Sequence, residues 1–151
     1  MNYTTKELIE KATKMPENYA LCFNTDCPLS SQCLRAIEAK KQDGSNLYIR
    51  IVNPFNTKKD ENGQCPAYRD STKTITYAIG FHKRMTEINN DTRRVYRELH
   101  TIFRNTHYYD MLNGNTLITP EEQDIIRSTA EKYGYEFPEN GFDMMVVGKV
   151  W

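Results

Sequence analysis

The chain has 151 residues, of which 20 are basic and 20 are acidic, so its formal net charge is zero. This balance gives no global electrostatic preference for nucleic acid or for an anionic membrane surface. The hydrophobic fraction of 38% and the charged fraction of 26% are typical of a soluble globular protein with a modest core. No apolar run approaches the roughly 20 residues that a membrane-spanning helix needs. The N-terminus is polar where a signal peptide is apolar. We therefore expect a cytoplasmic protein without a membrane partner.

The first half of the chain predicts short elements joined by polar loops. Thr5 is a suitable N-cap for a helix over residues 6–14. A second short helix is expected at residues 34–40, directly after a polar stretch that holds three cysteines. Alternating side chains predict strands at residues 47–52 and 74–81.

The second half is expected to be mostly helical. Apolar residues at helical spacing predict a helix that begins at Asp91 or Thr92 and ends at Ile102. A short helix should follow over residues 106–112. The tail, residues 142–151, is apolar enough to dock against the core as a strand.

The clearest signal for a helix start is the run Thr119-Pro120-Glu121-Glu122. Threonine is a good N-cap, proline fits the first helical turn, and Glu122 can close a capping box with Thr119. Apolar residues then mark one side of this helix, and Gly134 supplies a C-terminal stop.

Helices and strands do not alternate regularly along the chain, which favours an α+β fold with a small antiparallel sheet. We expect a single domain with two lobes. Residues 1–82 would form a lobe built from a cysteine knuckle and the sheet, and residues 83–151 would form a helical C-terminal lobe.

Four cysteines are the sharpest chemical feature of the sequence: Cys22, Cys27, Cys33 and Cys65. Thiols stay reduced in the cytosol, so these residues favour metal binding over disulfides. Tetrahedral zinc takes four thiolates at about 2.3 Å. Prolines that directly follow Cys27 and Cys65 would stiffen the loops that present the sulfur atoms. We predict a structural zinc site with four cysteine ligands, in which metal binding contributes to the free energy of folding.

Two other interpretations of the cysteines remain open. An iron–sulfur cluster also takes four thiolates, and a Cys-Pro ligand is familiar there. A free cysteine is otherwise a small and often buried hydrophobe. A catalytic thiol would need a nearby base, and the histidines lie far downstream at His82, His100 and His107.

A second candidate site covers residues 92–114, because two predicted helices with a short turn between them resemble the helix-turn-helix of phage repressors. Arginine would neutralise phosphates, Asn can read adenine, and Thr and His can bond to bases or phosphates. The predicted nucleic-acid contacts are Arg93, Arg94, Arg97, Arg104, Asn105, Thr106, His107 and Tyr109. The turn lacks the usual glycine, however, and looks short for this motif. The alternative is a helical hairpin whose aromatic residues, Tyr96, Phe103, Tyr108 and Tyr109, pack a core.

The sequence contains no GxGxxG, Walker, HExxH or GxSxG motif. We therefore expect a binding protein rather than an enzyme. The leading prediction is a zinc-stabilised binding module that acts as a regulator contacting DNA. The alternatives are a protein–protein adaptor with no nucleic-acid role and an iron–sulfur redox or sensor protein.

Several short motifs together resemble one family. They are Cys22-x4-Cys27-Pro28-x4-Cys33-Leu34-Arg35, Val52-Asn53-Pro54, Cys65-Pro66-Ala67-Tyr68-Arg69, Tyr77-Ala78-Ile79-Gly80, Thr106-His107-Tyr108-Tyr109 and Leu117-Ile118-Thr119-Pro120-Glu121-Glu122-Gln123. As a set, they are similar to small uncharacterised Bacteroidales proteins that form a domain-of-unknown-function family. The resemblance implies that the four cysteines belong to one shared pattern. It also implies that glycine is common at the position that Arg104 occupies in this chain.

Overall fold

A computed structural model of the chain describes residues 3–56, 59, 61, 63–87 and 92–151. The chain divides into two compact units. The helical unit comprises Met1–Thr13 and Ile75–Gly148, and the cysteine unit comprises Lys14–Thr74 and Lys149–Trp151. The lobes predicted from sequence, 1–82 and 83–151, divide the chain at a different place.

The fold is α+β, with a small antiparallel sheet of two strands, as predicted. The cysteine unit contains α2 (Leu34–Lys40) and a short 3-10 turn, η1 (Pro54–Asn56). The remaining elements build the helical unit: α1 (Thr5–Thr13), β1 (Thr74–Ile79), α3 (His82–Glu87), α4 (Thr92–Phe103), α5 (Asn105–Leu112), α6 (Pro120–Lys132), η2 (Glu139–Gly141) and β2 (Met144–Lys149). None of the helices in the described part of the chain is long and apolar enough to cross a membrane.

The first helix starts through a capping box at Thr4, one residue before the predicted cap at Thr5. The Glu7 amide donates to the Thr4 hydroxyl over 3.3 Å, and the Glu7 carboxylate accepts from the Thr4 amide over 2.6 Å. These reciprocal bonds hold two of the amide groups that a helix start leaves unpaired. The Thr4 amide and hydroxyl both donate to the Glu7 carboxylate, and these two bonds lower the pKa of Glu7.

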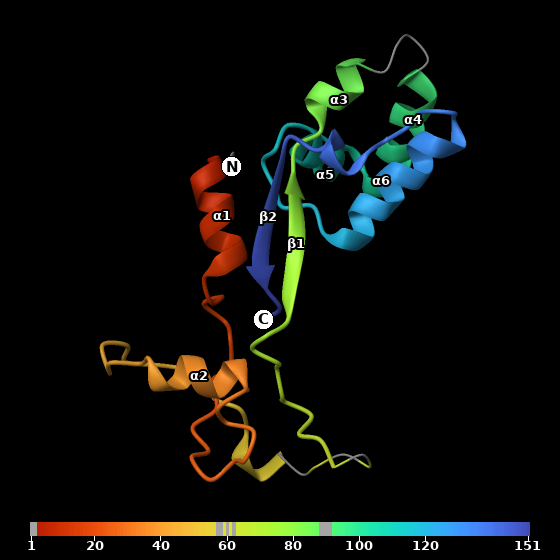
Figure 1. The fold of residues 1–151 in the computed structure, drawn as a ribbon. Coiled ribbons are helices and arrows are strands. Elements are labelled where there is room, and N and C mark those ends of the chain that lie inside the picture. The colour runs from red at the N-terminus through yellow and green to blue at the C-terminus, as the bar shows by residue number, and fades with distance from the viewer. Residues whose placement is uncertain (1–2, 57–58, 60, 62, 88–91) are drawn as a thin grey trace. The chain divides into compact units, whose positions relative to one another are not determined.

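Helix α1 packs on the sheet of the helical unit. Its buried residues Leu8 and Ala12 contact Ile79 of β1 and Val146 of β2. Burying a leucine side chain contributes roughly 1.5–3 kcal/mol. Figure 1 shows α1 alongside the two strands, whereas α3 to α6 gather into one cluster.

The cluster of helices encloses the main core of the helical unit. Phe81, two residues after β1, meets the rings of Tyr108, Phe137 and Phe142 edge to face, at centroid distances of 6.0–6.4 Å. This geometry suits aromatic quadrupoles and adds to the gain from burial. The other buried members of this core are Ala78, Val95, Leu99, Phe103, Met111, Ile118, Ile126 and Ala130.

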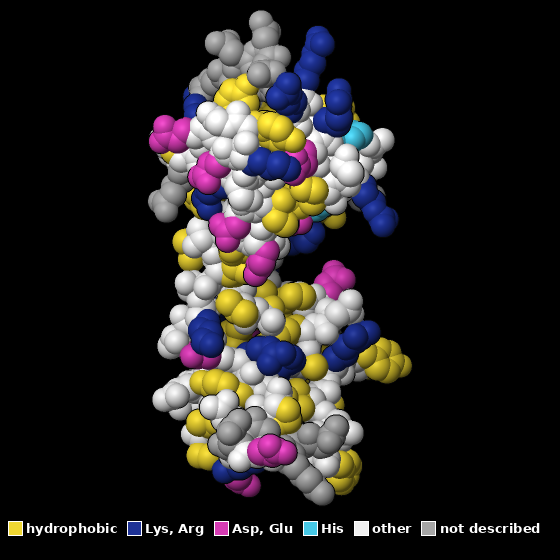
Figure 2. Space-filling model, turned by 90° about the vertical axis from the view of Figure 1, so that its right-hand side faces the viewer, with side chains coloured by type: hydrophobic (Ala, Val, Ile, Leu, Met, Phe, Trp, Pro, Cys, Tyr) yellow, Lys and Arg dark blue, Asp and Glu magenta, His cyan; other side chains and the backbone are white. Residues whose placement is uncertain are grey.

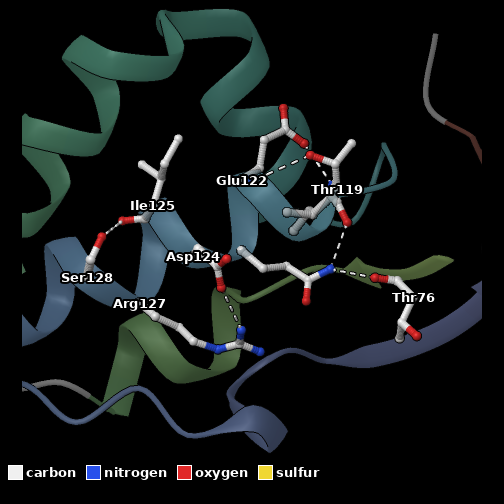
Figure 3. A network of polar contacts seen from close by, with 9 residues as sticks. Thr76, Thr119, Glu122, Asp124, Ile125, Arg127 and Ser128 are labelled. Atoms are coloured by element: carbon white, nitrogen blue, oxygen red, sulfur yellow. Dashed lines mark hydrogen bonds and ion pairs between the residues drawn. The ribbon is translucent and has the colours of Figure 1, made fainter. Parts of the chain in front are cut away.

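Helix α6 confirms the predicted capping box at Thr119 and Glu122 (Figure 3). One turn into the helix, the side-chain amide Nε2 of the buried Gln123 donates to the carbonyl oxygens of Thr76 and Ile118, over 2.9 and 3.0 Å. Ile118 in turn forms an antiparallel bridge with Ala78 of β1. The start of α6 is therefore fixed to one edge of the sheet.

The predicted helices over residues 6–14, 34–40, 92–102 and 106–112 are confirmed to within one residue at each end. The alternative helix start at Asp91 lies outside the described residues. The strand at 74–81 and the C-terminal strand are also confirmed.

One strand prediction is wrong, and one helix was not predicted. In the segment 47–52 only Ile51 forms a ladder pair, an isolated parallel bridge to Leu21. Alternation of side chains alone does not supply the neighbouring strand that a sheet needs. The unpredicted helix, α3, spans only six residues.

The cysteine unit has a small core. Tyr19, Leu21 and Ala39 are buried there, and Tyr19 meets the ring of Trp151 edge to face at 5.3 Å. The guanidinium of Arg35 lies over the Tyr19 ring at 4.4 Å. This unit buries much less apolar surface than the helical unit, so additional contacts matter more for its stability.

Candidate functional site

All four cysteines lie in the cysteine unit, and none is in a disulfide. Cys33 is buried, and the other three are half-buried. Backbone contacts bring their segments together: the Cys22 amide donates to the Arg35 carbonyl over 3.2 Å, and Cys33 forms an antiparallel bridge with Asp70. The chain near Cys33 therefore lies beside the chain that follows Cys65.

The described residues contain no group of three or more His, Cys, Asp or Glu side chains placed to hold a metal ion. A zinc ion needs four ligand atoms about 2.0–2.3 Å away. The spacing of cysteines in the sequence limits how far apart their segments lie, but it does not set where the thiols point. The four-cysteine metal site thus remains a prediction.

The exposed side of α4 carries three of the predicted nucleic-acid contacts. Arg93 and Arg97 are one helical turn apart and lie on the same face, and Arg94 is next to them. All three side chains are exposed, whereas Val95 and Leu99 on the opposite face are fully buried. Figure 2 shows Lys and Arg side chains gathered on the part of the helical unit that holds α3 and α4 in Figure 1.

A fourth arginine stands between α4 and α5. Arg104 is exposed and is the single residue that links the two helices. Within the described part of the chain, no acidic side chain forms an ion pair with Arg93, Arg94, Arg97 or Arg104. These four positive charges are therefore not neutralised by the acidic groups of the described chain.

Arg104 holds an unusual backbone conformation, with φ 60° and ψ 158°. It is the only non-glycine residue with positive φ among those the structure describes. This part of conformational space is essentially restricted to glycine. The conformation turns the chain between α4 and α5 within one residue, whereas the repressor motif uses a turn of three or four residues.

The start of α5 presents polar groups next to these arginines. Asn105 and Thr106 are its first two residues and are exposed. No side chain caps this helix at Arg104. The first amide groups of α5 therefore receive no capping bond from the side chain of Arg104, and uncapped amide groups at a helix start favour an anion.

His107 and Tyr109 are less available than predicted, because each is held by a neighbour. His107 is half-buried, and its Nε2 lies 2.7 Å from Oε1 of Glu122, the same carboxylate that closes the α6 capping box. Tyr109 is 43% exposed, but its hydroxyl lies 2.7 Å from that of Tyr96. This hydrogen bond raises the pKa of Tyr96.

The aromatic residues of α4 and α5 divide between core and surface. Phe103 and Tyr108 are buried, as the helical-hairpin alternative predicts. Tyr109 is exposed and Tyr96 is half-buried, and both contact the ring of His100, at 5.9 and 5.2 Å. The helical-hairpin alternative therefore accounts for the burial of Phe103 and Tyr108. It does not account for the exposure of Tyr109 or the partial exposure of Tyr96.

One acidic residue, Glu98, lies on α4 itself. Its carboxylate accepts from Nζ of Lys132 over 2.8 Å and from the hydroxyl of Tyr133 over 2.6 Å. These two bonds lower the pKa of Glu98. Its negative charge is therefore compensated by α6, so the surface of α4 keeps its excess of positive charge.

Sequence reasoning missed an exposed apolar segment in the cysteine unit. Leu47, Tyr48, Ile49 and Ile51 are exposed, and a hollow of about 320 Å³ lies beside Ile51. The signal was present, since residues 47–52 carry apolar side chains on both faces of the predicted strand. A strand of that kind needs cover on both faces.

Comparisons with known proteins identify a family for this chain, but the family has no assigned activity. No curated protein and no solved structure matches the chain. One family model matches residues 3–149, which is nearly the whole chain. The chain therefore belongs to the family of unknown function DUF6078.

Proposed function

We propose that the protein is a binding module that contacts DNA through the arginines of α4, Arg104 and the start of α5. The observation that carries the proposal is the set of four exposed arginines without an acidic partner in the described chain. Arg104 stands at the end of the helix that bears the other three, so all four belong to one continuous stretch of α4 and its C-terminal junction.

The excess of positive charge is local to this stretch, since the whole chain is neutral. Residues 92–106 contain four arginines and a single acidic residue, Glu98, which Lys132 and Tyr133 already hold. Each arginine that neutralises a phosphate releases condensed counterions from DNA. Four phosphate contacts would give a slope of log K against log salt of roughly −3.6.

Sequence preference would come from the exposed side chains at the start of α5. Asn105 can form two hydrogen bonds with adenine, and Thr106 can bond to a base or a phosphate. His107 is engaged with Glu122, so we assign it a supporting role. Because Arg104 alone joins the helices, the docking would differ from that of the repressor motif.

The test is binding of a fluorescently labelled duplex of about 20 base pairs, measured by anisotropy at low salt. The double variant Arg93→Gln/Arg97→Gln should bind at least tenfold more weakly. The control Lys6→Gln/Lys73→Gln removes the same charge from exposed positions outside α4 and α5 and should bind nearly as the parent does. Equal weakening in both double variants, or no binding by the parent, would contradict the proposal.

We also propose that the four cysteines, Cys22, Cys27, Cys33 and Cys65, hold one structural zinc ion, with an iron–sulfur cluster as the alternative. Support comes from their confinement to one unit with a small core, where metal binding would add folding free energy. The loops would have to close around the ion. Metal content of protein prepared without oxygen decides the question: one zinc per chain supports zinc, and iron with sulfide supports a cluster. Metal-free protein of unchanged stability would refute both.

A protein–protein adaptor is the second candidate function. It is favoured by the exposed apolar side chains of residues 47–51 in the cysteine unit, because monomeric proteins rarely expose a contiguous apolar patch without a partner. If the chain is an adaptor without a nucleic-acid role, the duplex test above gives no binding. A change in that segment would then remove association with a protein.

A further inference from the structure

The segment 47–52 of the cysteine unit is extended at Ile51 and is paired along one edge there. The Leu21 amide donates to the Arg50 carbonyl, and the Val52 amide donates to the Leu21 carbonyl, each over 2.8 Å. These two bonds flank the parallel bridge between Leu21 and Ile51. They are the ladder bonds of this segment in the described chain.

The other edge of the segment is unpaired among the described residues. In an extended chain, the amide and carbonyl groups of alternate residues point to opposite edges. Because Arg50 and Val52 bond to Leu21, the backbone groups of Ile49 and Ile51 point away from it. No backbone hydrogen bond from the described residues reaches those groups. An open edge of this kind is a template for another strand.

The side chains along this edge are apolar and exposed. Ile49 is 45% exposed and Ile51 55%, and the alternation of an extended chain puts these two on one face. Leu47, which is 86% exposed, lies at a bend that precedes them. On the opposite face stand Tyr48, which is 88% exposed, and Arg50. Figure 2 shows hydrophobic side chains projecting from the surface of this unit.

We propose that this edge pairs antiparallel with the same segment of a second copy of the chain, in a register centred on Ile49. In that register Ile49 lies opposite the partner's Ile49, and Tyr48 lies opposite the partner's Arg50. The outward backbone groups then meet as hydrogen-bonded pairs, as the antiparallel ladder requires. The contact is isologous, so a two-fold axis closes it as a dimer.

The choice of a second copy follows from the self-complementarity of the segment. The register puts apolar side chains opposite apolar ones on one face, and Tyr48 opposite the partner's Arg50 on the other, where the guanidinium can lie over the ring. Arg50 is the only charged residue between Asp43 and residue 56. A register centred on Arg50 would put two guanidinium groups opposite each other and is disfavoured.

The first test is the molar mass of the full chain by sedimentation, in reducing buffer and without nucleic acid. The parent should sediment at about twice 17.7 kDa at micromolar concentrations. Ile49→Lys puts two ammonium groups opposite each other at the axis and should give a monomer. Val147→Lys adds the same charge at a side chain that is 60% exposed in the helical unit, and it should leave the dimer intact. A monomeric parent at about 100 µM, or a dimer that survives Ile49→Lys, overturns the proposal.

A charge pair at Tyr48 tests the register itself. Tyr48→Glu would face the partner's Arg50 with opposite charge, and Tyr48→Lys would face it with like charge. Because the dimer contains this pair twice, the two variants should differ in dissociation constant by roughly two- to thirtyfold, with Tyr48→Glu the tighter. Tyr48 is almost fully exposed, so neither change disturbs the core of the unit. Equal dissociation constants, or a tighter Tyr48→Lys dimer, overturn the register and the proposal with it.

Discussion

Replacing Arg104 with glycine is expected to stabilise the helical unit. Arg104 is held at φ 60° and ψ 158°, in a region that is essentially open to glycine alone. A side chain there costs on the order of 1–3 kcal/mol, and the helices on either side fix the backbone. Glycine at this position removes that cost.

The conformational entropy that glycine adds to the unfolded state reduces this gain in stability. Glycine loses more conformational freedom on folding than other residues do, which costs roughly 0.5–1 kcal/mol. The Arg104 side chain is exposed and forms no hydrogen bond with the described residues, so its removal loses little packing. The net stabilisation of Arg104→Gly should be about 0–2.5 kcal/mol.

Urea denaturation followed by far-ultraviolet circular dichroism measures this change, since most of the helices lie in the helical unit. The only tryptophan, Trp151, is in the cysteine unit, so its fluorescence reports on the other half of the molecule. Arg104→Ala is the matched control, because it removes the same side chain and keeps the strained φ. If Arg104→Gly is no more stable than Arg104→Ala, the strain argument is wrong.

The same two variants separate stability from binding. Both remove the positive charge of Arg104, so both should weaken DNA binding to the same degree. If binding follows stability instead of charge, Arg104→Gly will bind more tightly than Arg104→Ala, and the role of this arginine as a phosphate contact will be contradicted.

Three further changes test the fold of the helical unit. Gly80→Ala should destabilise it by at least about 1–2 kcal/mol in urea denaturation, since Gly80 has φ +66° and a Cβ there would collide with the Asp143 carboxylate. Unchanged stability would contradict the close approach of Asp143 to Gly80. Gln123→Leu should cost roughly 1–3 kcal/mol, because two carbonyl groups lose their donor; a neutral effect would mean that water replaces it. Burial raises the pKa of Tyr108 above its ordinary value of 10.0, so its contribution to stability is full below pH 10 and is lost as the pH rises beyond it. Tyr108→Phe should therefore reduce the loss of stability between pH 9 and 11 in thermal denaturation, and an identical pH profile would refute this.

The start of α6 could be predicted from sequence because its signals are local. Thr119, Pro120 and Glu122 form the capping box within four residues, and the structure confirms both reciprocal bonds. The bonds from Gln123 to the carbonyls of Thr76 and Ile118 could not be predicted. The bond to Thr76 joins residues that are 47 positions apart in the sequence. A local sequence pattern carries no information about such a contact.

The strand predicted at 47–52 shows the opposite case. Its side chains alternate as in a strand, but pairing depends on a neighbouring segment, and Leu21 is the only residue of the described chain that pairs with it. The segment therefore has the sequence pattern of a strand. No neighbouring segment of the described chain pairs with it in a way that would bury Leu47 and Ile49. An apolar segment whose outer edge is unpaired in the described chain is a template for a second copy of the same segment.

For the candidate site, sequence reasoning located the arginines but not their surroundings. Periodicity in α4 correctly puts Val95 and Leu99 inward and Arg93 outward. It could not show that His107 is held by Glu122, since these residues belong to different helices. The glycine that the family resemblance implies at position 104 matches the positive φ of Arg104 in the structure.

The salt dependence of duplex binding measures the proposed contact between the α4 arginines and DNA phosphates. The slope of log K against log salt counts the phosphates that the protein neutralises, at about 0.9 for each. We expect a slope of roughly −3.6 for the parent and about −1.8 for Arg93→Gln/Arg97→Gln, since two of four contacts are removed. If the two slopes are equal, or if the parent does not bind duplex at low salt, then the arginines of α4 are not a DNA contact and the proposed function is contradicted.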